Sequence, residues 1–560
     1  PLKKPEQKNL WQTMQNLRKN KKERKHMKTF KKALAIFLCL LTVFSLSSVA
    51  FAAEKTTPVV VVSGMASFPL YDGESGEQVY PPSTKGIMAV VGKSLLPFSK
   101  LLFAGDWDYF AEKTFKAVFD GLFEAISCDK NGNSIHNIKS PSFPLSVNNY
   151  PEILNHENEE DEQGVVKGLA SALGGENVYF YNYDWRLDPL ESAEGLHDYI
   201  ENVKREKGVQ KVTLVPCSMG GVVANSYLYK YGNESVKKIV YCLVASKGLD
   251  LVGELFSKKL EIKTDTLLER LFSFERGEIF TQTLISVLET GLEITPSVKA
   301  AVDKFVAAFL EKTNDKAYDE LLSISFASMP GMWSFCPDEY YETAKKEMFK
   351  NGAEKTFVDR IDEYHYNVQK GAEKLITKAK ESGTEIYVTA SYGYVGFPVT
   401  EKAFEQSDCL IETKNESFGA TCADYGESFS ADYKALGTVC KDETHTHVST
   451  DGIVDASTCL LPEQTWFIKY MKHVGFKNNT EASELLVWLV SSETPLSVND
   501  ENGYPQFTEF NNTTGKLKSL TGSEIKHSVL DERFSVKARF FEFLHNLYSL
   551  IMNLVDKIKK

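Results

Sequence analysis

The chain has 560 residues, of which 42% are hydrophobic and 25% charged, a composition typical of globular proteins. Its length predicts more than one domain. Residues 1–53 hold 12 lysines and arginines against 2 glutamates, so the net charge of −12 leaves −22 on residues 54–560. A net charge this negative on residues 54–560 argues against a nucleic-acid-binding protein, because the phosphate backbone would repel them.

Residues 1–53 have the order of features of a basic leader and signal peptide. The basic stretch 27–32 precedes an apolar run at 33–46, and a small-x-small pattern ends at Ala52. We expect cleavage after Ala52 and therefore a secreted or extracytoplasmic protein. An uncleaved anchor is the alternative, although the apolar run is short for a membrane span. Residues 1–26 resemble an upstream extension or a misread start.

Predicted strands and helices alternate along much of the chain, which is the pattern of a parallel sheet covered by helices. In chain order the predictions are strand 57–62, a helical stretch 86–127, helix 161–173, strand 178–183, helix 190–207, strand 211–215, a helix from 221 and strand 238–245. Residues 248–382 are then predicted to be mostly helical. The alternation resumes with strands 385–389 and 465–469 and with helix 481–490.

We therefore expect an α/β core formed by residues 54–247 and 384–495, with a helical cap or lid inserted at 248–383. Residues 496–560 would form a C-terminal extension. Within it, apolar residues recur at helical spacing in 535–560 and lysines follow them, which predicts an amphipathic helix. This helix could lie on a lipid surface, or pack on the body or on another subunit.

Ser218 stands between a predicted strand and a predicted helix, in the sequence Pro216-Cys-Ser-Met-Gly220. This order is typical of a nucleophile elbow, a turn that lifts a serine hydroxyl out of the sheet. Pro216 occupies the position where the usual motif has glycine. The alternative is an ordinary turn between a strand and a helix of an α/β sheet.

The same arrangement predicts two backbone donors for an oxyanion, the negatively charged oxygen of a tetrahedral intermediate. One is the amide of Met219, directly after the serine. The other is the amide of Met65, after the first strand, where Gly64 permits the required turn. A routine turn at the end of a strand would also explain Gly64.

A serine in such a turn takes its acid and then its base from later positions in the chain. Asp451, in a polar loop followed by glycine, is the predicted acid; Asp455 and a plain Asp-Gly turn are the alternatives. His473, shortly after strand 465–469, is the predicted base. His445 and His447 precede the acid, which is the wrong order, although they could line the mouth of the site or bind a metal weakly. The predicted set needs no cofactor and no metal.

The cysteines divide into two groups. Cys217 and Cys242 fall in predicted core positions and are expected to remain thiols. Four others lie in a polar, loop-rich stretch and are candidates for disulfides, which an exported protein can form: Cys409, Cys422, Cys440 and Cys459. Their pairing cannot be read from the sequence.

Four motifs together resemble the lecithin:cholesterol acyltransferase-like family of α/β-hydrolases. They are Val59–Met65, the stretch Tyr183-Asp-Trp-Arg-Leu-Asp-Pro189, Cys217–Gly220, and Asp451–Val454 followed by a histidine. The resemblance covers roughly residues 58–246 and 385–490. It implies an α/β-hydrolase fold with a triad of Ser218, Asp451 and His473. Arg186, with Asp184 or Asp188, is expected to form a structural ion pair.

By that resemblance the chain is expected to be a secreted serine hydrolase or O-acyltransferase acting on lipid esters, as lipases, phospholipases and acyltransferases do. Its partners would be an ester substrate and a membrane or lipid surface; the oligomeric state stays open. A thioesterase or peptidase using the same triad is one alternative. A non-catalytic surface-binding protein with a hydrolase fold is another, and Pro216 favours it.

Overall fold

The computed structural model describes residues 56–154, 162–262, 296–433, 447–473, 475–476, 480–500, 503–512 and 514–520. The expected leader and the expected C-terminal helix lie outside these residues. The chain divides into two compact units, Pro1–Thr56 and Thr57–Lys560. The second unit holds all the helices and strands described below.

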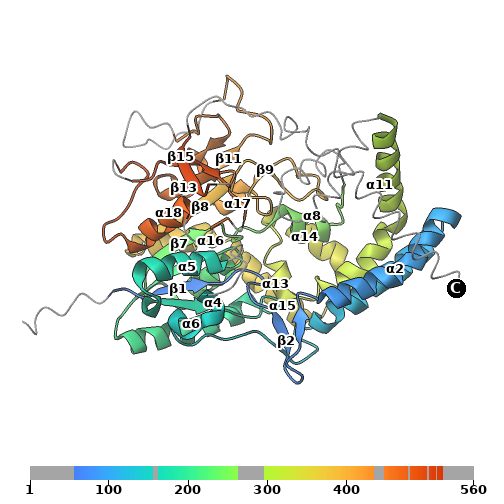
Figure 1. Cartoon of the computed structure of the whole chain (residues 1–560), viewed down its shortest axis with the longest axis horizontal. Helices are drawn as coiled ribbons and strands as arrows, with labels where there is room; N and C mark the ends of the chain where they lie inside the picture. Colours follow the sequence, from blue (N-terminus) through green and yellow to red (C-terminus); the bar gives the residue numbers. More distant parts are fainter. Residues whose placement is uncertain are drawn as a thin grey trace, which may run out of the picture. The chain divides into compact units, whose positions relative to one another are not determined.

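An eight-stranded sheet forms the centre of the second unit (Figure 1), in the order β15-β14-β13-β8-β7-β6-β1-β5. Its strands are β1 (Val59–Val62), β5 (Val178–Tyr181), β6 (Val212–Pro216), β7 (Val236–Cys242), β8 (Glu385–Tyr392), β13 (Thr465–Lys469), β14 (Phe507–Asn511) and β15 (Lys516–Ser519). Every neighbouring pair is parallel except β14 and β15. The expected α/β arrangement with a mostly parallel sheet is confirmed.

Both faces of this sheet are buried. Alternate residues of β1 enter different hydrophobic clusters, with Val60 and Val62 in one and Val59 and Val61 in the other. Helices α6 (Pro189–Lys207) and α7 (Gly220–Tyr231) pack in the first cluster, and α5 (Glu162–Leu173) and α18 (Glu481–Ser491) pack in the second. Two covered faces explain why the central strands are apolar throughout rather than alternating.

The segment between β7 and β8 is helical where it is described, as the sequence predicts. Its helices are α8 (Asp250–Phe256), α11 (Pro296–Ala317), α12 (Ser323–Ser325), α13 (Pro330–Trp333), α14 (Asp338–Met348), α15 (Lys355–Tyr364) and α16 (Ala372–Glu381). The buried aromatic rings of Trp333 and Tyr341 meet edge to face among them. Both residues belong to the same hydrophobic cluster as Val60 and Val62, so part of this segment shares the core on one face of the sheet.

Two long helices follow the first strand. They are α2 (Thr84–Ala104), which begins two residues before the stretch predicted to be helical, and α3 (Trp107–Val118), which lies within it. A three-stranded sheet of β2 (Leu70–Asp72), β3 (Gln78–Tyr80) and β4 (Ile138–Lys139) flanks them in the sequence. Two further two-stranded sheets pair β9 (Tyr394–Val395) with β10 (Gln406–Ser407) and β11 (Thr421–Cys422) with β12 (Val454–Asp455). The described residues also form two short helices, α4 (Pro151–Leu154) and α17 (Thr413–Glu416).

Candidate functional site

Ser218 lies in a tight turn between β6 and α7. Its φ angle is 51°, a left-handed value that residues other than glycine seldom adopt. The Ser218 amide donates to the Cys242 carbonyl at 3.2 Å, and the Ser218 carbonyl accepts from the Ala245 amide at 3.0 Å. The turn is therefore held in a strained conformation by bonds to the chain at and beyond the end of β7, as found at many functional sites.

The helix after the serine begins unusually close to neighbouring backbone. A Cβ atom added to Gly220 would stand 2.3 Å from the carbonyl oxygen of Val62, and one added to Gly221 would stand 2.5 Å from the Oγ of Ser246. Neither position has room for a side chain. Glycine at both positions therefore lets the helix start close to the end of β1 and to the chain beyond β7.

Pro216 fits at the end of β6 because the strand ladder is interrupted on one side. The register between β6 and β7 extends to the Leu214–Ile239 pair and returns only as an isolated bridge between Cys217 and Cys242. Proline has no N–H to donate, so it is tolerated where a ladder bond is missing. On the other side Pro216 keeps its register with β1.

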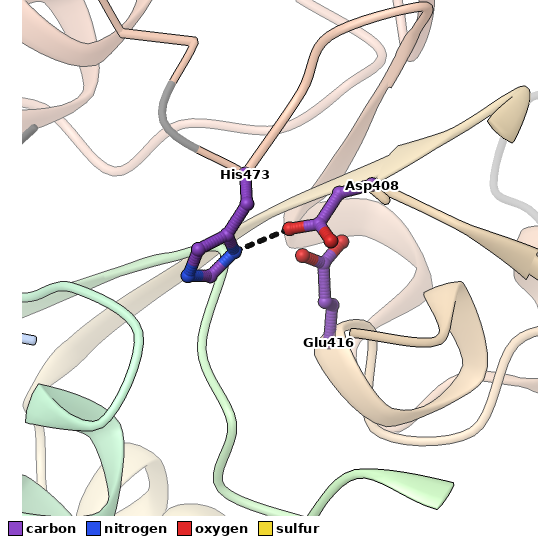
Figure 2. A group of neighbouring side chains, drawn as sticks. All are labelled: Asp408, Glu416 and His473. Carbon is purple, nitrogen blue, oxygen red and sulfur yellow. Dashed lines mark hydrogen bonds and ion pairs between the residues drawn. The ribbon is translucent and has the colours of Figure 1, made fainter. Parts of the chain in front are cut away.

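His473 is brought to the serine by the end of β13. Its Nε2 atom lies 2.9 Å from the Oγ of Ser218. Its Nδ1 atom lies 2.5 Å from the Oδ2 of Asp408 (Figure 2), and its backbone amide donates to the Asp408 carbonyl at 2.9 Å. The structure thus joins His473, the base predicted from the sequence, to the serine and to a carboxylate.

Asp408 is fully buried and firmly oriented. Its Oδ1 atom accepts the amides of Leu410 and Ile411 at 2.8 and 2.7 Å, which leaves Oδ2 to His473. Burial alone would raise the pKa of Asp408, but the charge and hydrogen bond of His473 help to hold that pKa below its usual value. The carboxyl group is therefore ionised and placed to fix the imidazole.

Asp451, the acid predicted from the sequence, lies elsewhere, and that prediction is wrong. Its Oδ2 atom forms an ion pair with Lys469 Nζ at 2.9 Å and accepts the Tyr392 hydroxyl at 3.2 Å. The alternative Asp455 accepts the Tyr433 hydroxyl at 2.9 Å and caps the following short helix. The physical reason is that Lys469 is itself buried and requires a counter-charge.

The sequence offered only a weak signal for Asp408. This residue lies between the strands that became β8 and β13, where the chain order places an acid. It follows the two-residue strand β10, however, and no apolar run in the sequence predicts that strand. The Asp-Gly pair at Asp451 is a stronger turn signal, and for this reason the sequence favoured Asp451 over Asp408 as the acid.

The two expected oxyanion donors belong to neighbouring turns. A Cβ atom added to Gly220, in the serine turn, would stand 3.0 Å from the Ser63 carbonyl, two residues before Met65. The Tyr183 hydroxyl donates to that same carbonyl at 2.9 Å and steadies the loop after β1. Among the described residues, neither the Met65 nor the Met219 amide donates to a protein acceptor. Both amides stay the predicted oxyanion donors.

Arg186 forms the ion pair expected from the sequence, with Asp184 as its partner. The guanidinium is fully buried; its Nε and Nη2 donate to the two Asp184 oxygens at 2.9 and 2.6 Å, and its Nη1 donates to the Ile126 carbonyl at 2.7 Å. Asp188 instead caps α6 through the Leu190 amide at 2.9 Å. These bonds fix the loop after β5, a structural role.

Two further groups of residues were singled out in the sequence, the histidines before Asp451 and the cysteines. His447 is buried, with its Nδ1 atom 2.9 Å from Gln506 Oε1, while His445 lies outside the described residues. No disulfide joins the described members of the cysteine group, Cys409, Cys422 and Cys459, and Cys440 is not described. The core cysteines Cys217 and Cys242 are buried thiols, as expected.

Comparisons with known proteins leave the family open. No family model matches the sequence, and no curated protein matches it. A chain in the solved structure described as "The crystal structure of Tle4-Tli4 complex" is similar over 60% of this chain and 75% of that chain, at 14% sequence identity and a TM-score of 0.23. A likeness with so low a score supports no inference, so the function must be argued from the site itself.

Proposed function

We propose that the protein is a serine hydrolase or O-acyltransferase of the α/β-hydrolase class that acts on lipid esters. The observation that carries the proposal is the hydrogen-bonded series Ser218–His473–Asp408, in which a strained serine, an imidazole and a buried carboxylate are joined in the order that nucleophilic catalysis requires. The choice of lipid esters rests on the resemblance of the sequence motifs. Export of the protein is part of the proposal and rests on the leader sequence.

The first half of the reaction forms an acyl-enzyme. His473 Nε2 takes the proton of Ser218 Oγ as this oxygen attacks the ester carbonyl carbon. Asp408 holds the proton on Nδ1 and stabilises the imidazolium. The developing oxyanion accepts hydrogen bonds from the Met65 and Met219 amides. The ester C–O bond then breaks, and His473 returns its proton to the departing alcohol.

The second half frees the serine. Water or an acceptor alcohol loses its proton to His473 while its oxygen attacks the acyl carbon. When the tetrahedral intermediate collapses, the bond between the acyl carbon and Ser218 Oγ breaks. Ser218 Oγ then recovers the proton from His473. Water as the acceptor yields a carboxylic acid, and an alcohol yields a new ester. The same residues serve both outcomes, so only the access of the acceptor separates hydrolysis from transfer.

Labelling with a fluorophosphonate tests the activated serine directly. The wild-type protein should be labelled and Ser218→Ala should not, while Ser226→Ala serves as the control because Ser226 Oγ is buried in α7 and donates to the Val222 carbonyl. Absence of labelling in a folded wild-type protein would favour the non-catalytic alternative. A panel of phospholipids, triglycerides, thioesters and peptides, with and without an acceptor alcohol, then distinguishes the lipid proposal from a thioesterase or peptidase.

A further inference from the structure

Helix α2 (blue in Figure 1) exposes an apolar surface that the proposed chemistry does not use. Eight of its large apolar side chains are exposed: Ile87, Met88, Val91, Leu95, Leu96, Phe98, Leu102 and Phe103. Phe103 is 90% exposed. Contiguous apolar surface of this kind is uncommon on soluble proteins and marks a site of interaction.

Most of the exposed side chains gather on one side of the helix, whereas Leu96 and Phe103 lie outside that sector. At 100° per residue, six of the eight fall in a single sector beside the buried residues Val90, Pro97 and Leu101. The buried residues are spread along the helix, and α3 packs against it, with the rings of Phe98 and Phe110 6.3 Å apart. One sector of α2 is thus fixed to the protein while the next faces outward.

Charge identifies the surface that would cover this face. Helix α2 carries Lys85, Lys93 and Lys100 and no acidic residue, within a chain of net charge −12. At 100° per residue Lys93 and Lys100 lie on the other side of the helix from the outward apolar sector, and Lys100 Nζ lies 3.8 Å from the centre of the Tyr109 ring. An apolar face with lysines on the other face is typical of helices that lie in a membrane interface, where lysines attract anionic headgroups.

The helix is also long and apolar enough to cross a membrane by length and composition, and it is the one described helix that is. Its buried contacts argue for lying on the membrane instead. Ser83 caps its start through the Gly86 amide, Gly105 ends it in a left-handed conformation, and residues buried in the protein occur from Val90 to Leu101. A helix anchored in this way cannot leave the protein surface to span a bilayer without losing those contacts.

We propose that α2 docks the protein onto an anionic lipid surface, with its outward apolar sector in the interface and its lysines at the headgroups. The biological role of this docking rests on the proposed function, because docking would hold the Ser218 site close to esters in the lipid. Binding itself does not require turnover, so the two proposals fail separately.

The test uses the full Ser218→Ala chain and sedimentation with vesicles of phosphatidylcholine, with or without phosphatidylglycerol. We expect binding that increases with the anionic lipid and falls by about tenfold or more in Leu95→Glu/Leu102→Glu, since both side chains would be drawn from the interface. Ile135→Glu, at a residue 56% exposed like Leu95, is the matched control and should bind as the parent does. Lys93→Gln/Lys100→Gln should lose the preference for phosphatidylglycerol.

Two outcomes would overturn the docking proposal. One is equal vesicle binding by the parent and the Leu95/Leu102 variant. The other is a dimer in sedimentation velocity that this variant abolishes, because α2 would then be covered by a second copy. Turnover of a short soluble ester by the wild-type protein is measured separately. Vesicle binding without any turnover would count against the proposed function and leave the docking proposal intact.

A different observation concerns Glu416, the last residue of α17. This side chain is fully buried, its Oε2 atom accepts the Ser391 amide at 2.6 Å, and its Oε1 atom receives no donor from the described residues. Figure 2 shows its carboxyl group facing that of Asp408, and side-chain atoms of Asp408, Glu416 and His473 lie within 4.8 Å of one another. Two buried carboxylates this close do not both ionise.

We infer that Glu416 is a positioning residue, a neutral carboxylic acid whose O–H donates to Asp408. This assignment gives the unpartnered Oε1 atom a hydrogen bond and gives the Asp408 carboxylate a further donor besides His473 and two backbone amides. Burial and the nearby charge of Asp408 raise the pKa of Glu416 well above its usual value. Glu416 would act on catalysis through the orientation of Asp408 and touch no substrate.

Glu416→Gln and Glu416→Leu separate this role from simple packing. The glutamine amide can still donate, so Glu416→Gln should keep kcat within about threefold, whereas Glu416→Leu should lose about tenfold or more in kcat with KM little changed. At alkaline pH, where the wild-type carboxyl ionises and kcat falls, Glu416→Gln should retain its activity. Fluorescence melting curves confirm that both variants are folded.

Three results would refute the positioning role. Glu416→Gln as inactive as Glu416→Leu, in a folded protein, would mean that the site needs an ionised carboxylate. Wild-type activity that EDTA abolishes and a divalent cation restores would mean that the three side chains share a metal instead. If kcat fell at the same alkaline pH in wild type and in Glu416→Gln, Glu416 would not be the group that loses a proton there.

Discussion

Asp451 and Lys469 form an ion pair, with Oδ2 and Nζ 2.9 Å apart and each side chain only 5% exposed. Removing one member of such a pair leaves the other charge buried and unpaired. Asp408, by contrast, has its carboxylate shared between His473 and two backbone amides. The two aspartates should therefore respond to the same substitution in opposite ways.

Asp408→Asn should lower kcat on the order of 10⁴-fold, because the amide no longer holds the imidazole in the required tautomer. Asp451→Asn should instead cost about 3–5 kcal/mol of stability and leave kcat of the folded protein within a few-fold. Ester turnover and chemical denaturation of both variants check this. An inactive Asp451→Asn protein of normal stability would restore the assignment made from the sequence.

The sequence predicted the parts of the site that directly follow buried strands. Ser218 and His473 come after the apolar runs that form β6 and β13, and parallel strands present their carboxyl ends at one edge of a sheet. Asp408 lies in the long connection between β8 and β13. The position of its side chain depends on the turn to Ile411 and on short strands that have no apolar pattern. Such tertiary contacts leave no periodicity in the sequence.

The edge of the sheet was missed for a related reason. Residues 496–531 are polar, yet Phe507–Asn511 and Lys516–Ser519 add two strands to the sheet. Only Phe510 among the apolar residues of these strands is buried. Backbone pairing with β13 places this hairpin together with the packing of Phe507, Phe510 and Leu517 against the core, and composition alone does not reveal that pairing.

Gly220 and Gly92 give a matched pair of glycine substitutions in helices. Gly220→Ala should disrupt the serine turn and abolish most ester turnover, because its Cβ would stand 2.3 Å from the Val62 carbonyl, a backbone atom of the central strand that cannot easily move. Gly92→Ala meets nothing within 4 Å and should stabilise α2 by about 0.5–1 kcal/mol. Turnover and melting curves of both variants test the contrast. Equal activity in the two would contradict the close approach.

Glu412 should make stability depend on pH. Burial and the nearby Asp250 charge raise the pKa of Glu412 to about 8 from an ordinary value near 4.5. A raised folded-state pKa means that its stabilising contribution is complete below pH 4.5 and is lost as pH rises towards 8. The loss can reach about 1.4 kcal/mol for each pH unit in that window.

Glu412→Gln cannot ionise and should remove this dependence. Its oxygen can still accept the Asp250 amide and the Asn415 side chain, the two bonds that Oε2 accepts at 3.1 and 3.0 Å. The melting temperature of the variant relative to wild type should therefore rise steadily between pH 4.5 and 8. A difference that stays constant over this range would show that Glu412 does not carry the proton in the folded protein.

Pro216→Gly tests whether the proline weakens the serine turn or supports it. Pro216 lies where the ladder between β6 and β7 is interrupted, so a new glycine N–H would find no strand partner on that side. Glycine also adds conformational freedom to the unfolded chain, which should lower stability by roughly 0.5–1 kcal/mol. Because Ser218 keeps its bonds to Cys242 and Ala245, we expect similar or reduced turnover. A large rise in kcat would mean that proline holds the serine in an unproductive position, and the non-catalytic alternative would then gain support for the natural sequence.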